Sequence, residues 1–121
     1  MRTFCNQNQR DLAISTWTET EFYGALGRRS RDGTIPKSSA EVLAKKLKSH
    51  LARGLYQLLP TEAGHVSQAA VFTRRFSLEV KSPDALHLAL VQHEGCELVT
   101  SDKAMAVVAR ALSMTVTHLI A

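Results

Sequence analysis

Three acidic residues of this chain lie where the strands of a parallel sheet would bring them to one edge. Glu21 lies in the first turn of the helical stretch that follows the strand-like segment 11–16. Asp84 opens an apolar helix, and Asp102 directly follows the strand-like run 97–100. Ligands of open α/β sheets bind beyond the carboxyl ends of the strands, so the three carboxylates are candidates for one site. Clustered carboxylates repel one another unless a cation neutralises them, and hard oxygen ligands favour Mg²⁺ or Mn²⁺. Such a site can activate water and stabilise the leaving oxygen of a phosphodiester.

Each of these carboxylates also has a purely structural explanation. Glu21 fits a capping box with Thr18, in which the glutamate reaches back to the threonine amide. Asp84 lies in the first turn of its helix, where a negative charge favours the helix dipole. Asp102 is a suitable N-cap for the helix after it. Spacing alone therefore leaves both explanations open, although the set of three is more informative than any one member.

The elements that must position these residues alternate along the chain. We expect strands at 11–16, 55–59, 97–100 and 114–119, and helices at 18–31, 40–53, 61–76, 83–94 and 103–112. Ser38 or Ser39 and Thr61 are the expected N-caps of the second and third helices. The first residues are polar and resemble the frayed end of a helix more than a central strand. The alternation predicts one α/β domain over residues 1–121, with a mainly parallel sheet flanked by helices.

Basic residues are concentrated in one part of the chain. The formal net charge is +4, and between residues 28 and 53 the basic residues are Arg28, Arg29, Arg31, Lys37, Lys45, Lys46, Lys48 and Arg53, against Asp32 and Glu41. A basic half on a small domain is typical of a protein that binds a phosphate backbone. A solvated helix face that aids solubility explains the same charges equally well.

Compartment and membrane association are also predicted from the sequence. No apolar run reaches the roughly 18–20 residues that span a bilayer, and the N-terminus has no apolar segment of a secretory signal. Cys5 and Cys96 are far apart and in different contexts, so we expect two reduced thiols in a cytoplasmic protein.

Three ordered segments resemble the motifs of PIN-domain ribonucleases of the VapC toxin type. Residues 14–22 resemble a strand followed by Ser-x-x-Thr-x-x-Glu, residues 82–89 an Asp-Ala-hydrophobic-x-x-Ala helix, and residues 98–102 a hydrophobic-x-Thr-x-Asp strand end. The resemblance implies a PIN-like (Rossmann-like) fold and a Mg²⁺- or Mn²⁺-dependent endoribonuclease. It also implies RNA and a cognate antitoxin as partners, and a homodimer.

The resemblance assigns roles residue by residue. It makes Glu21, Asp84 and Asp102 catalytic metal-site carboxylates, and Thr100 and Ser101 neighbouring hydroxyls that orient water or a ligand. Arg28 and Arg29, in the basic stretch, are the expected RNA contacts.

The chain departs from the family pattern at its beginning. The family starts with a central strand that ends in an aspartate, and Asp11 precedes a strand instead of ending one. We therefore expect a truncated domain that lacks the first strand and one of four carboxylates. The leading hypothesis is a ribonuclease. The alternatives are a catalytically impaired remnant that dimerises or binds an antitoxin, and a nucleic-acid binder that uses no metal.

Other candidate groups are less informative. His50, His65 and His118 are scattered, and His87 and His93 are six positions apart on one helix, so the sequence predicts no zinc site. His87 is expected to pack near the buried helix, with a role beside Asp84 left open.

Aromatic residues flank Glu21. Trp17 and Tyr23 are positioned to stack on a base, but core packing is the favoured explanation for both.

Overall fold

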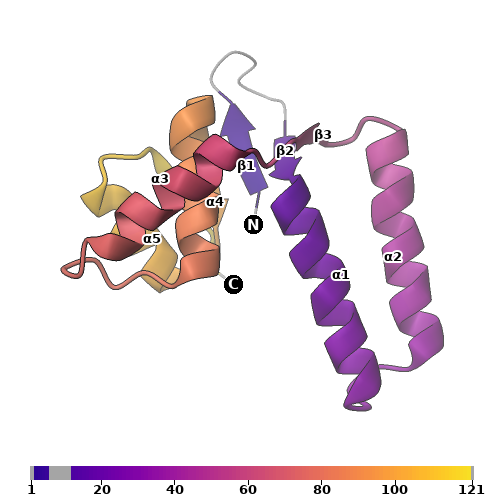
Figure 1. The fold of residues 1–121 in the computed structure, drawn as a ribbon. Helices are drawn as coiled ribbons and strands as arrows, with labels where there is room; N and C mark the ends of the chain where they lie inside the picture. Colours follow the sequence, from indigo (N-terminus) through magenta and orange to yellow (C-terminus); the bar gives the residue numbers. More distant parts are fainter. Residues whose placement is uncertain (1, 6–11, 121) are drawn as a thin grey trace.

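A five-stranded sheet forms the centre of the molecule, and its strand order is β3-β2-β1-β4-β5 (Figure 1). The computed structural model describes residues 2–5 and 12–120. The strands are β1 (Arg2–Cys5), β2 (Leu12–Ser15), β3 (Gln57–Leu59), β4 (Cys96–Thr100) and β5 (Val116–His118). The helices are α1 (Thr16–Arg31), α2 (Lys37–Ala52), α3 (Ala63–Arg74), α4 (Ser82–Glu94) and α5 (Lys103–Ala111). The expected α/β architecture, with parallel strand pairs flanked by helices, is confirmed.

The beginning of the chain corrects the sequence prediction. Residues 2–5 are not the frayed end of a helix but form β1, which occupies the central position of the sheet. β1 runs antiparallel to both β2 and β4, while β2 pairs with β3 and β4 pairs with β5 in parallel. The four other strands therefore all point the same way, and their carboxyl ends share one edge. Parallel pairings make up only half of the ladders, so "mainly parallel" describes the strand directions but not the pairings.

The main core lies between α3, α4, α5 and β4. Leu88 and Leu98 are fully buried there, and Phe72, Met105 and Val108 pack around them. α4 is apolar nearly all round, and most of its residues from 85 to 91 are inaccessible to solvent. The buried helix that the sequence predicted is thus confirmed, and it holds Asp84 at its first turn.

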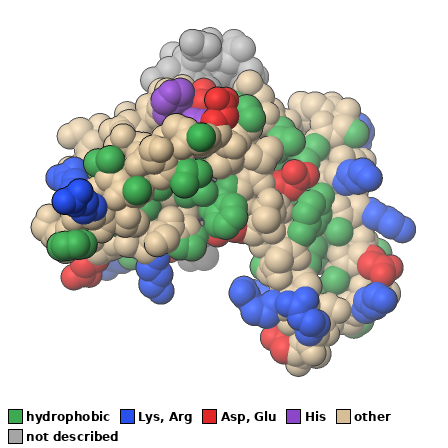
Figure 2. All heavy atoms as spheres, in the orientation of Figure 1, with side chains coloured by type: hydrophobic (Ala, Val, Ile, Leu, Met, Phe, Trp, Pro, Cys, Tyr) green, Lys and Arg blue, Asp and Glu red, His purple; other side chains and the backbone are tan. Residues whose placement is uncertain are grey.

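α1 and α2 form a hairpin that extends away from this body (Figure 1). Among its residues, α1 has none that is fully buried, and α2 has only Ala40. The Lys and Arg side chains of the basic stretch accordingly lie on the hairpin surface, along its length and at its far end (Figure 2). The hairpin presents charge, whereas the body supplies the core.

Several helix starts differ from those predicted. Ser15 caps α1 and accepts a hydrogen bond from the Thr18 amide at 3.0 Å, so the Thr18–Glu21 capping box is wrong. Pro36 precedes α2, in place of Ser38 or Ser39. Glu62, not Thr61, is the N-cap of α3.

The predicted end of α4 and the predicted N-cap of α5 are confirmed. Gly95 ends α4 with φ of 64°, a left-handed conformation that glycine adopts without strain. Asp102 caps α5 through its side chain. Both signals act within a few residues and depend little on the rest of the fold.

Cys96 corrects the expectation of two reduced thiols, because it is disulfide-bonded. Cys5, the other cysteine of the chain, is the residue opposite Cys96 in the register of β1 and β4. Within the described residues, no helix combines the length and the apolar composition that crossing a bilayer requires.

Candidate active site

The sheet brings the three predicted carboxylates to the same edge. β2 leads directly into α1, which carries Glu21, and β4 leads into Asp102 at the start of α5. Because these two strands point the same way, both residues lie beyond carboxyl ends of the sheet. Asp84 joins them from the first turn of α4. The amino end of β1 also lies at this edge, since Arg2 pairs with Val99.

The carboxyl of Asp84 has a shifted pKa. Burial raises the pKa of its carboxyl above the usual range, and the negative charges of Asp102 and Glu21 raise that pKa further. His87 and Lys81 act in the opposite direction but do not cancel the shift. Asp84 and Asp102 also line one pocket of about 150 Å³ together with Glu79 and Lys81. The carboxylates are therefore close enough to repel one another.

Glu21 is held by a histidine that is distant in sequence. The Nε2 atom of His87 hydrogen-bonds the Glu21 carboxylate, and the Nδ1 atom of His87 lies 3.5 Å from the Thr18 hydroxyl. Burial lowers the pKa of His87, which favours the neutral ring. A neutral ring that donates from Nε2 to Glu21 accepts at Nδ1 from Thr18. His87 therefore orients Glu21, an arrangement that spacing alone did not predict.

Asp102 is positioned by its own helix and by Thr100. Its Oδ1 atom accepts a hydrogen bond from the Met105 amide at 3.1 Å, and its amide donates to the Thr100 hydroxyl at 3.1 Å. Thr100 is buried at the end of β4, with 4% of its surface exposed. Only Oδ1 takes part in these contacts, so the other carboxylate oxygen has no hydrogen bond to a described residue. Asp102 can cap α5 and bind a ligand at once.

Among the described residues, no ion pair joins the remaining predicted site residues to the carboxylates. Ser101 is exposed, and its backbone carbonyl accepts a hydrogen bond from His118. Arg28 and Arg29 are exposed in the last turn of α1. Arg28 lies seven residues after Glu21 on the same helical face, about 10 Å further along the axis. The roles expected for these residues stay predictions.

Trp17 and Tyr23 are half-buried on α1. Trp17 lines a pocket of about 410 Å³ with side chains of α3 and α4, among them Ala69 and Leu86. Burial raises the pKa of the Tyr23 phenol, and the neighbouring Glu19 adds to the shift. Neither ring belongs to the buried core of the described residues, so the core packing favoured from the sequence is not confirmed, and base stacking stays a prediction.

The charge balance of the site fits a divalent cation. Within the described residues, no Lys or Arg forms an ion pair with Glu21, Asp84 or Asp102. Burial is the main cause of the raised pKa of Asp84, and the negative charges of Asp102 and Glu21 add to it. Carboxylate oxygens are the ligands that Mg²⁺ and Mn²⁺ prefer. These residues therefore fit Mg²⁺ or Mn²⁺ better than a softer metal.

Replacing Thr100 by Val tests how Asp102 is positioned. The change keeps the volume but removes the acceptor of the Asp102 amide, so we expect a loss of about 1 kcal/mol in the free energy of unfolding. The displaced carboxylate is expected to weaken Mg²⁺ binding about tenfold, as measured by isothermal titration calorimetry. Thr117→Val, which removes an exposed hydroxyl on β5, is the matched control. Equal Mg²⁺ affinity of the two variants would contradict the role of Thr100.

Comparison with known proteins adds one finding. The family model for the PIN domain matches residues 5–111 of the chain. No curated protein matches the sequence. The matched range includes all three carboxylates and every predicted site residue.

Proposed function

The chain belongs to the PIN domain family, and from this membership we propose that it is a metal-dependent endoribonuclease, the toxin of a VapC-type toxin–antitoxin pair. PIN domains are generally metal-dependent nucleases. The observation that carries the proposal is the convergence of Glu21, Asp84 and Asp102 at one edge of the sheet, where the pKa of Asp84 is raised. A purely structural role for each carboxylate does not account for their mutual repulsion.

Glu21, Asp84 and Asp102 would hold the divalent cation. A cation bound there supplies charge neutralisation at the phosphodiester and promotes ionisation of the attacking water. In the hydrolysis, the water oxygen bonds to phosphorus, the bond to one ester oxygen breaks, and that oxygen takes up a proton. The protein contributes preorganised carboxylates, so little rearrangement is needed when the RNA arrives.

The supporting residues keep that arrangement in place. His87 orients Glu21 through its Nε2 atom, and Thr100 holds the amide of Asp102. Both supporting side chains are buried. Because buried side chains have few alternative rotamers, the carboxylates are constrained even though they are partly open to solvent.

The basic hairpin supports RNA as the substrate. Arg28 lies on the same face of α1 as Glu21, and Arg29 is beside it. These two residues would contact phosphates next to the scissile bond, while the lysines of α2 add longer-range attraction. A protein that used this surface for phosphate contacts would bind RNA less tightly as salt rises.

The hairpin also supports a protein partner. Its exposed side chains include Phe22, Val42 and Leu43, and a groove of about 290 Å³ runs between the two helices. Apolar side chains that remain exposed on a small domain commonly mark an interaction surface. A cognate antitoxin and a homodimer are both proposed on this basis.

One observation favours the impaired remnant as a second candidate. β1 occupies the centre of the sheet in the reverse direction, so Arg2 and not an acidic residue lies at the edge with the carboxylates. The described part of the site thus has three carboxylates, where the family pattern has four. A remnant of this kind would bind a partner without cleaving RNA.

Cleavage of RNA by this chain with Mg²⁺, with Mn²⁺ and with EDTA tests the proposal. We expect cleavage in the presence of either cation and none with EDTA, because the carboxylates alone provide no positive charge for the phosphodiester. Circular dichroism confirms that the chain is folded in each condition. Cleavage that persists in EDTA would contradict the proposal, and a folded chain that never cleaves would favour the remnant.

A further inference from the structure

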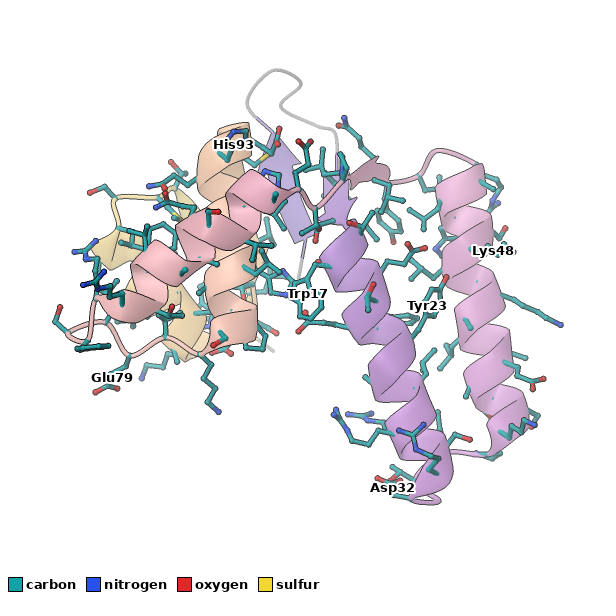
Figure 3. The ribbon with its side chains drawn as sticks, viewed as in Figure 1. Trp17, Tyr23, Asp32, Lys48, Glu79 and His93 are labelled. Carbon is teal, nitrogen blue, oxygen red and sulfur yellow. The ribbon has the colours of Figure 1, made fainter. Side chains whose placement is uncertain are left out.

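The start of α3 and the end of α4 bring together a second group of ligand-type side chains. The Nε2 atom of His65 lies 3.3 Å from the Nδ1 atom of His93 and 3.3 Å from the Oε1 atom of Glu94. The third distance, between His93 Nδ1 and Glu94 Oε1, is also 3.3 Å. His93 is labelled at the end of α4 in Figure 3. These three residues, the His65–His93–Glu94 cluster, lie outside the carboxylate site.

The helix ends explain why the cluster forms. His65 is the third residue of α3 and lies buried against α4, with 1% of its surface exposed. Glu94 is the last residue of α4, since Gly95 turns the chain into β4. His93 is 69% exposed in its side chain. The cluster therefore has one buried ligand and an opening to solvent.

The spacing of the three atoms matches a tetrahedral metal site. Zinc binds histidine nitrogen and carboxylate oxygen at about 2.0–2.2 Å, which places neighbouring ligand atoms about 3.3–3.5 Å apart. Imidazole nitrogens select Zn²⁺ over Mg²⁺. We propose that His65, His93 and Glu94 bind Zn²⁺, with water as the fourth ligand, and fasten the start of α3 to the end of α4. The sequence predicted no zinc site because these histidines are far apart in the chain, whereas the structure places His65 and His93 side by side.

A hydrogen bond competes with the metal. The Glu62 amide donates to Nδ1 of His65 at 2.9 Å, so in the metal-free protein the His65 proton is on Nε2 and points to Glu94 and His93. Zinc needs the Nε2 lone pair, so the proton must move to Nδ1 and the Glu62 amide must turn to water. That hydrogen bond is part-buried, so its loss opposes zinc binding and the metal–ligand bonds must offset it. Zinc binding thus replaces half of the α3 capping box.

Zinc titration of the Asp84→Asn variant tests this inference, since that background weakens the carboxylate site. We expect one zinc per chain by isothermal titration calorimetry, and a rise in Tm on zinc addition. His93→Ala in the same background is expected to weaken zinc binding about tenfold or more. His93 is exposed, so the variant should fold, which its Tm without zinc verifies. His50→Ala, which alters a histidine on α2, is the control and should leave zinc binding unchanged.

A second readout separates coordination from a surface effect. Zinc binding should accelerate hydrogen exchange at the Glu62 amide, because that amide loses its acceptor. No zinc binding, or equal zinc affinity with and without His93, would overturn the inference. Neither result depends on RNA cleavage, so the zinc site and the ribonuclease proposal can fail separately.

Discussion

Asp84→Asn is expected to reduce metal-dependent RNA cleavage by about 100-fold or more, since loss of a metal ligand removes several kcal/mol of stabilisation from the transition state. The same change is expected to raise the Tm of the metal-free protein. Burial and the charges of Asp102 and Glu21 both disfavour ionised Asp84 in the fold. The amide keeps the shape without the charge. Cleavage assays with Mg²⁺ and thermal melts with EDTA measure the two effects.

The pH dependence follows from the raised pKa of Asp84. The folded state binds a proton at Asp84 more readily than the unfolded state, so lowering the pH through the folded-state pKa stabilises the metal-free wild type. This increment is complete below the pKa of the unfolded state and is lost as the pH rises. Cleavage changes in the opposite direction, because the protonated carboxyl holds a cation poorly. As the pH falls through the pKa of Asp84 in the folded state, we therefore expect RNA cleavage to decrease and the stability of the metal-free protein to increase.

A control variant separates the site from general charge effects. Glu41→Gln removes an exposed carboxylate on α2, and we expect cleavage and its pH dependence to stay at the wild-type level. If Asp84→Asn lowered the Tm of the metal-free protein, the repulsion among the carboxylates would be refuted. If it left cleavage intact, Asp84 would not belong to the active site.

Two substitutions of Asp102 are expected to separate its role as a metal ligand from its role as the N-cap of α5. Asn caps helices about as well as Asp, so Asp102→Asn should keep the stability of the protein but reduce cleavage by about 100-fold or more. Asp102→Ala removes both the charge and the acceptor of the Met105 amide. We expect it to reduce cleavage equally and also to cost about 1 kcal/mol in the free energy of unfolding. Urea denaturation and RNA cleavage assays measure the two quantities.

Cleavage by the two variants also shows whether Asp102 belongs to the active site. Were Asp102 only an N-cap, Asp102→Asn would cleave RNA as well as the wild type does. Glu97→Gln, on the preceding strand, alters an acid that hydrogen-bonds Thr117 and should preserve cleavage. Loss of cleavage in this control would indicate a general effect on β4 instead.

Local signals in the sequence were sufficient for much of the fold. Gly95 ends α4 and Asp102 caps α5 as predicted, because each signal involves hydrogen bonds within a few residues of the chain. The apolar run in α4 predicted a buried helix, since such a surface must leave water wherever it packs. Identification of the three carboxylates also came from the sequence. It combined their positions after strands with their resemblance to ordered family motifs.

The helix starts that were misplaced have a common cause. The N-cap positions of α1, α2 and α3 are held by Ser15, Pro36 and Glu62, although nearby Thr or Ser residues were plausible caps. Thr61 is instead used in a contact with Thr16, its hydroxyl accepting a hydrogen bond at 2.8 Å. A partner 45 positions away competes with a local cap, and spacing does not reveal that competition.

By itself, the sequence determined which residues carry charge, which segments must be buried and where several helices end. The tertiary structure alone decided which of those residues meet. β1 is central although it has only four residues, because strand pairing depends on the open edges of β2 and β4 and not on local propensity. The pairing of His87 with Glu21 and of His65 with His93 arises where helices pack. Contacts between side chains that are far apart in the chain leave no pattern in the local sequence. They form only when the helices pack in the folded protein.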